Sequence, residues 1–185
     1  MKRILCCVAM MVVAFSVPAL AAGNLDEGNG EIGVGVGNTN LDSNTGFDSA
    51  TSLAVRGGYC FNKNFEIEGQ LSSASESQDV AGTNVDGTFR QYMVNGVYNF
   101  ETPKAIVPYV MAGLGMADTE VEASGVSVSD SGTAYQIGGG SRFFFGKAKK
   151  AAFRVDLAMV TENTFNESST STNISAGFTW KLGNR

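Results

Sequence analysis

The chain has 185 residues, enough for one domain, and its 13 Lys and Arg against 18 Asp and Glu give a net charge of −5. This acidic balance argues against nucleic-acid binding, which needs a basic face. The sequence contains no histidine, which excludes Ser-His-Asp and Cys-His catalysis and every His-ligated metal or haem site. We therefore expect a protein that is not an enzyme and that carries no metal or other cofactor.

Residues 1–21 have the features of a secretory signal peptide. Lys2 and Arg3 precede an apolar run over residues 4–17, and Ala19-Leu20-Ala21 matches an A-x-A cleavage site. That run is too short for a transmembrane helix, which takes about 20 residues. We predict cleavage after Ala21, a short segment over 22–29, a folded domain over 30–182 and a tail over 183–185. Cys60 is then the one cysteine of the mature chain, so no intramolecular disulfide can form.

From residue 30 onward apolar residues alternate with small or polar ones, which predicts strands separated by turns. In the first strand, for example, Ile32, Val34 and Val36 face one way and the glycines between them face the other. Since the mature chain has no long apolar run, only a closed β-barrel could carry it across a membrane. The expected strands are 30–38, 50–60, 65–74, 88–100, 107–117, 133–145, 152–161 and 171–182.

The predicted connections alternate in length. Those at 61–64, 101–106 and 146–151 are short, whereas the connections after the first, third, fifth and seventh strands are long and polar. Short turns on one side and long loops on the other are typical of an outer-membrane barrel. The long loops hold eleven acidic residues and no Lys or Arg, which fits exposed soluble loops, divalent-cation bridging to lipopolysaccharide, or a partner-binding surface.

Aromatic residues gather beside the short turns and near the end of the last strand. In a folded barrel they would form a ring at one level, as in the aromatic girdle of a membrane interface. An aromatic soluble core is the alternative, but it would spread such residues along the strands. The predicted girdle comprises Tyr59, Phe65, Tyr98, Phe100, Phe143, Phe145, Phe153 and Trp180.

The opposite face of the strands carries four acids and four bases among Gly, Ala, Ser and Asn. Eight strands leave an interior just wide enough for side chains, and buried charges must pair, so this pattern predicts a salt-bridged plug. A path for protons or ions along the charges is the alternative. We expect Glu66 or Glu68 to contact at least one arginine of this face, namely Arg56, Arg142 or Arg154. The predicted lumen cluster comprises Glu31, Arg56, Glu66, Glu68, Arg142, Arg154, Asp156 and Lys181.

Four segments resemble the OmpA-like outer-membrane barrel superfamily: Arg56–Ser72, Tyr98–Ala117 with its P-Y-x-x-A-G-x-G start to a strand, Tyr135–Phe143 and Ile174–Leu182. The resemblance implies an all-β, eight-stranded, antiparallel, up-and-down transmembrane barrel with periplasmic turns and surface loops. It also implies residence in the outer membrane of a Gram-negative bacterium, with lipid, lipopolysaccharide and the barrel-assembly machinery as partners. Because only three residues follow the last strand, we expect no peptidoglycan-binding domain of the kind that larger members carry.

These observations predict a non-enzymatic outer-membrane barrel with a plugged lumen, which acts structurally or through its acidic surface loops. Two alternatives stay open: a narrow channel for small or apolar solutes, and a soluble periplasmic binding barrel. Relatives in the superfamily serve as structural proteins, adhesins, serum-resistance factors or narrow channels, so the resemblance by itself does not choose between roles.

Overall fold

A computed structural model describes residues 27–40, 49–80, 83–103, 105–146, 148–164 and 167–182. The predicted signal peptide, the loop acids Asp42 and Asp48 and the tail 183–185 lie outside the described residues. Within them, no helix is long and apolar enough to cross a membrane. The strands are β1 (Gly30–Asn40), β2 (Ser49–Cys60), β3 (Phe65–Val80), β4 (Thr83–Asn99), β5 (Ile106–Ala123), β6 (Val126–Phe145), β7 (Ala151–Thr164) and β8 (Glu167–Leu182).

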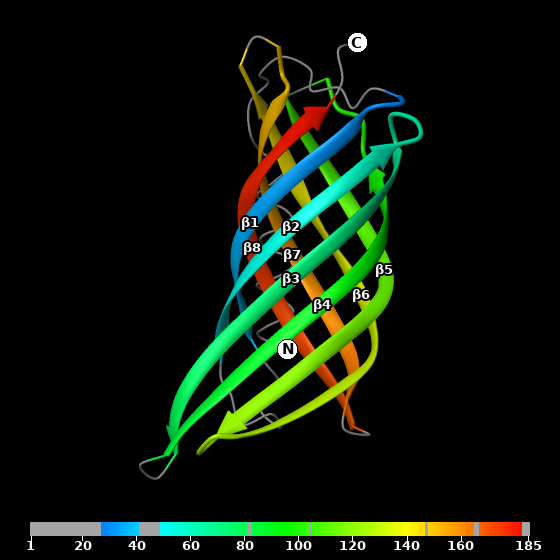
Figure 1. Cartoon of the computed structure of the whole chain (residues 1–185). Helices are drawn as coiled ribbons and strands as arrows, with labels where there is room; N and C mark the ends of the chain where they lie inside the picture. Colours follow the sequence, from blue (N-terminus) through cyan, green and yellow to red (C-terminus); the bar gives the residue numbers. More distant parts are fainter. Residues whose placement is uncertain are drawn as a thin grey trace, which may run out of the picture.

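The eight strands form one closed antiparallel barrel (Figure 1). Each strand pairs with its neighbours in the chain, and β1 closes the ring against β8, so that Gly30 lies opposite both Tyr59 and Leu182. Closure leaves no strand edge, so every strand satisfies its backbone groups on both sides. The predicted fold class is therefore confirmed.

The alternation along each strand separates an apolar exterior from a polar interior. Ile137 and Leu114 are each 66% exposed on the outside, and the aliphatic side chains of β1 to β3 are similarly exposed. A continuous apolar exterior of this kind has no counterpart on soluble monomers, whose largest apolar patches cover a few hundred Å². The exterior suits lipid and argues against the soluble periplasmic barrel.

One end of the barrel holds the short connections, and we call it the turn end. Its turns span residues 61–64, 100–105 and 146–150, close to the predicted bounds. In the first of them the Asn62 side chain accepts hydrogen bonds from the backbone N–H groups of Asn64 (2.9 Å) and Phe65 (2.8 Å). Strand β1 begins and β8 ends at this same end, at the top of Figure 1.

The opposite end, which we call the hairpin end, corrects the predicted loops. Three segments expected to be loops continue as paired strands, with Asp79 opposite Asn84, Ala123 opposite Val126 and Thr164 opposite Glu167. A ladder needs no apolar face, and alternating Ser, Thr and Val keep the extended conformation outside the membrane. Ser124 (φ 52°) and Gly125 (φ 79°) form the two-residue turn between β5 and β6. Both have the positive φ that the central residues of a tight hairpin turn need.

Candidate functional site

The lumen near the turn end is filled in two layers. An apolar layer of Cys60, Val107, Phe144 and Ala152 lies closest to the short turns. On the hairpin side of this apolar layer lies a layer of buried charged side chains from β1, β2, β3, β6 and β7, which we call the charge layer. Its members are Glu31, Arg56, Glu66, Glu68, Arg142, Arg154 and Asp156, all at most 6% exposed.

Arg142 on β6 holds two acids from different strands. Its Nη2 atom lies 2.8 Å from Glu31 Oε1 on β1 and 2.9 Å from Glu66 Oε2 on β3. Its Nη1 atom donates to Asn99 Oδ1 at 2.6 Å, and Asn99 in turn donates to Glu66 at 3.4 Å. Because Arg142 is fully buried, these contacts replace the water that its charge would otherwise hold.

Arg154 on β7 crosses the lumen to Glu68 on β3. Both carboxylate oxygens of Glu68 accept from it, Oε2 from Nη1 and Oε1 from Nη2 at 3.2 Å, which makes a bidentate pair. Its Nε atom donates to Asp156 Oδ1 at 2.9 Å and to the Tyr109 hydroxyl at 2.7 Å. The expectation that Glu66 or Glu68 contacts an arginine is confirmed by both acids.

Arg56 on β2 makes the loosest ion pairs of the charge layer. Its guanidinium lies 3.5 Å from Asp156 Oδ2 and 4.0 Å from Glu68 Oε1, and its Nε donates to Gln70 at 3.3 Å. Lys181, the eighth predicted lumen residue, is also buried, but its ammonium group lies 4.5 Å above the Phe144 ring, in the apolar layer. The structure therefore brings seven of the eight predicted residues into one network and places Lys181 beside it.

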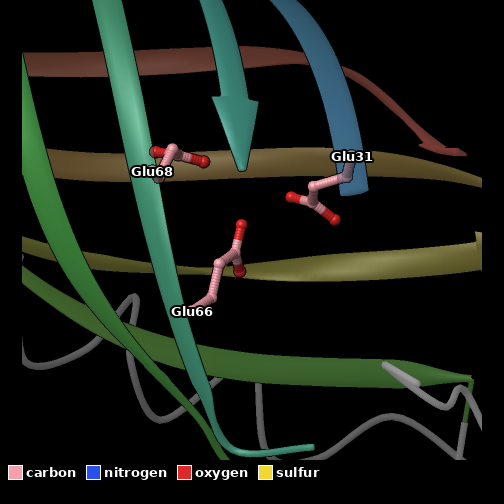
Figure 2. A group of neighbouring side chains, drawn as sticks. All are labelled: Glu31, Glu66 and Glu68. Atoms are coloured by element: carbon pink, nitrogen blue, oxygen red, sulfur yellow. The ribbon is translucent and has the colours of Figure 1, made fainter. Parts of the chain in front are cut away.

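Three carboxylates in this network converge, as Figure 2 shows for Glu31, Glu66 and Glu68. One oxygen from each lies within 4.8 Å of the other two, a spacing that a metal ion could bridge. Arg142 lies within 4.0 Å of all three acids, so its guanidinium already supplies the positive charge that a metal would bring. The donor set fits an arginine-neutralised plug better than a metal site.

The network leaves several buried atoms without hydrogen-bond partners. Among the described residues these include both oxygens of Glu31, Oε1 of Glu66 and Nε of Arg142. The Arg142–Glu31 contact is therefore a close ion pair that is not aligned as a hydrogen bond. Atoms of this kind are suited to bound water, which commonly bridges buried polar groups.

Tyr109 is the member of the site that sequence reasoning missed. Its ring centroid lies 4.8 Å from the guanidinium carbons of both Arg142 and Arg154, and its hydroxyl donates to Asp156. A cation above an aromatic face is favourable, especially where water is excluded. The sequence feature that could have identified Tyr109 is its inward-facing position directly after Pro108. Gly140 leaves the space that the Tyr109 ring fills, because a Cβ at residue 140 would lie 2.8 Å from Tyr109 Cζ.

The predicted girdle residues lie on the lipid-facing side near the turn end. Phe65 and Tyr98 meet edge to face at 5.0 Å between ring centroids, whereas Phe143 and Phe153 are tilted to each other, with their centroids 6.3 Å apart. The whole set is exposed except Phe143 and Phe153, which are half-buried.

Towards the hairpin end, Tyr92 and Tyr135 are also exposed on the exterior, at positions that the predicted girdle left out. Ten residues separate Tyr135 from Phe145. At the usual strand rise and tilt this spans about 25 Å, the height of an outer-membrane apolar band.

The chain matches a known protein family over most of its length. The profile of the outer membrane protein beta-barrel domain family matches residues 7–181. None of the curated proteins matches the chain.

Several solved structures share the fold. Neisserial surface protein A is 14% identical with a TM-score of 0.67 over 83% of this chain and 96% of its own. Ail of Yersinia pestis is 16% identical with a TM-score of 0.56, over 83% of this chain and 99% of its own. The N-terminal barrel domain of Pseudomonas aeruginosa OprF is 19% identical with a TM-score of 0.53, over 83% and 100%.

Proposed function

The chain belongs to the outer membrane protein beta-barrel domain family, and we propose that it is a closed, non-enzymatic barrel of the Gram-negative outer membrane. In this proposal a signal peptide over residues 1–21 directs export and is removed, and the barrel-assembly machinery inserts the folded domain. The turn end faces the periplasm and the hairpin end faces outward, as in barrels of this architecture. The girdle residues then lie at the periplasmic interface.

The observation that carries the closed-lumen proposal is the charge layer. Seven buried charged side chains from five strands meet in one network inside the barrel, and the apolar layer lies next to them on the turn side. An ion entering this region would have to displace a guanidinium from two or three carboxylates. Separating such a buried pair leaves charges without their partners in a region closed to water, which opposes steady conduction.

The proposed role is structural or is exerted through the hairpin end. We call the segments 75–80, 83–90, 118–132, 162–164 and 167–170 the outer extensions; they hold nine acidic residues and one base, Arg90. Ail has been solved in complex with the heparin analogue sucrose octasulfate. The outer extensions of the present chain would repel such an anion, so we propose a cationic partner, or lipopolysaccharide phosphates bridged by divalent cations.

Planar-bilayer recording tests the closed lumen. We expect no steady single-channel current from the purified barrel. A variant that opens the charge layer, Arg142→Ala with Glu66→Ala, should conduct, because it removes two long side chains from the centre of the plug. Steady currents from the unmodified protein would defeat the proposal and support the narrow-channel alternative. The observation in favour of that alternative is that oxygen atoms of Glu31 and Glu66 lack hydrogen-bond partners among the described residues and could bind water inside the lumen.

A further inference from the structure

Beyond the closed ring, three strands run past their neighbours at the hairpin end. In the described part of the chain, pairing of β6 with β7 starts at Thr133, pairing of β3 with β2 stops at Ser75, and pairing of β8 with β1 starts at Thr172. The ends of β6, β3 and β8 on the hairpin side of these residues are therefore sheet edges. Figure 1 shows the tips of the β5–β6 hairpin (yellow-green) and the β7–β8 hairpin (orange) apart from each other at the bottom. A strand edge with free backbone groups is a template for pairing with another chain.

The edge of β6 is the one best suited to such pairing. Residues 126–129 read Val-Ser-Val-Ser, with no charged residue, proline or bulge, the features by which native sheets commonly protect an edge. Val126 and Val128 are 66% and 55% exposed, and valine favours strands. By contrast, the edge of β3 carries Glu76 and Asp79, and the edge of β8 consists of Ser and Thr after its first residue.

The turn between β5 and β6 determines which backbone groups of this edge are free. In a two-residue hairpin the residues that flank the turn, here Ala123 and Val126, exchange hydrogen bonds, and hydrogen-bonded pairs then recur at every second position. The N–H and C=O groups of Val126 and Val128 therefore point to β5. Those of Ser127 and Ser129 point away from β5, and on that side no residue of the described chain is paired with them. An added antiparallel strand would satisfy these four groups.

The outward face of this edge favours a basic partner. Ser127 and Ser129 lie on this face, and the register places Glu122 and Glu120 of β5 directly opposite them. An added strand would lie about 10 Å from β5, and serine is short enough for a lysine or arginine side chain to reach across it to a carboxylate. Glu120 is shared with Arg90 at 3.8 Å, whereas Glu122 is exposed.

Val126 and Val128 lie on the other face of β6. Because directly opposite residues of antiparallel strands share a face, apolar side chains of an added strand would pack beside these valines and its basic side chains would lie beside the serines. We propose that residues 126–129 are a docking edge for an extended segment of another protein, in which basic and apolar residues alternate and which adds to β6 as an antiparallel strand. This names the binding mode of the cationic partner proposed above, and it rests on the outward orientation of the hairpin end.

A capped hexapeptide, Lys-Val-Lys-Val-Lys-Val, is the probe for this edge. Nuclear magnetic resonance of the refolded full barrel in zwitterionic micelles should show saturable shifts of the Ser127 and Ser129 backbone amides. In the proposed pairing the lysine N–H groups face β6 and the valine N–H groups face away. N-methylation of the three lysines should therefore weaken binding about tenfold or more, because main-chain hydrogen bonds are lost. N-methylation of the three valines, which gives a peptide of equal charge and mass, should change binding little.

Substitutions in the protein test the same pairing. Ser129→Pro removes an N–H that points away from β5, so the hairpin keeps its own hydrogen bonds, and proline is tolerated on such an edge. We expect peptide binding to weaken about tenfold, whereas Ser129→Ala, which keeps the N–H, should bind like the unmodified protein. Glu122→Gln should weaken binding about two- to fivefold, an effect that salt reduces. Heat-modifiable gel migration verifies that each variant is folded.

Three results would overturn the proposal. Equal binding of the two N-methylated peptides would mean that charge alone attracts them. Unchanged binding in folded Ser129→Pro would exclude pairing at this edge, and so would the absence of saturable shifts in the folded barrel.

The orientation is tested separately, by labelling Ser129→Cys on whole cells with a membrane-impermeant maleimide. We expect labelling, and the unmodified protein is the control because Cys60 is buried. Absence of labelling on intact cells, together with selective peptide binding in micelles, would defeat the outward orientation and leave the edge pairing standing.

Discussion

Replacing one partner of the Arg154–Glu68 pair should destabilise the barrel strongly. Arg154→Met keeps most of the volume of the side chain but leaves Glu68, 1% exposed, without its bidentate partner. Two unit charges about 4 Å apart interact by about 4 kcal/mol at an effective dielectric constant of 20. Loss of one member of a buried pair typically costs about 3–5 kcal/mol, and we expect a change of this size in the free energy of unfolding.

Urea titration of the barrel refolded into lipid vesicles measures this change, with intrinsic fluorescence of Trp180 as the signal. With a urea dependence of about 2 kcal/mol per molar, the midpoint should fall by about 2 M. Glu68→Gln alone should also destabilise the barrel, and the double variant should recover part of the loss, because neither charge is then left unpaired.

Arg90→Met is the matched control, since it removes the same charge from a pair with Glu120 at 3.8 Å. Both of those side chains are about half exposed, and such a pair contributes about 0–1 kcal/mol. Equal destabilisation by Arg154→Met and Arg90→Met, or simple additivity in the Arg154–Glu68 double variant, would refute the reasoning. Either result would mean that the lumen charges are hydrated independently.

Three further substitutions test the exterior, a turn and the packing of the lumen. Ile137→Arg, which puts a charge into the apolar band, should cost about 2–4 kcal/mol, whereas Ser129→Arg, on the same face of β6 but in the outer extensions, should cost about 1 kcal/mol or less; membrane yield after refolding compares them. Gly125→Ala should lower the urea midpoint, because a φ of 79° costs an L-residue about 1–2 kcal/mol. Gly57→Ala is the control: the added Cβ also meets open space, but φ at Gly57 is ordinary, so the midpoint should not fall. Equal midpoints for the two variants would contradict the turn assignment. Gly140→Ala should cost about 1–3 kcal/mol against the same Gly57→Ala control, since the added methyl collides first with the backbone carbonyl oxygen of Val155 and then with the Tyr109 hydroxyl. Unshifted Val155 and Tyr109 resonances would argue against these contacts.

The sequence alone predicted the number of strands, their inward and outward faces and the short turns. These features are local. A side-chain period of two determines which residues share a face, and a few adjacent residues determine where a short turn forms. The alternation within each strand was therefore enough to assign Glu66, Glu68, Arg142 and Arg154 to the interior. The outer extensions were missed because Ser- and Thr-rich pairing outside the membrane has no apolar face to reveal it.

Only the tertiary structure decided which lumen residues meet. Glu68 and Arg154 are 86 residues apart in the chain, and their contact depends on how far each strand is staggered against the next around the closed barrel. The stagger sets the height of every inward side chain, and no local pattern carries that information. The same holds for the position of Tyr109, whose ring on β5 lies between arginines of β6 and β7, because the stagger of these three strands sets the height at which their inward side chains meet.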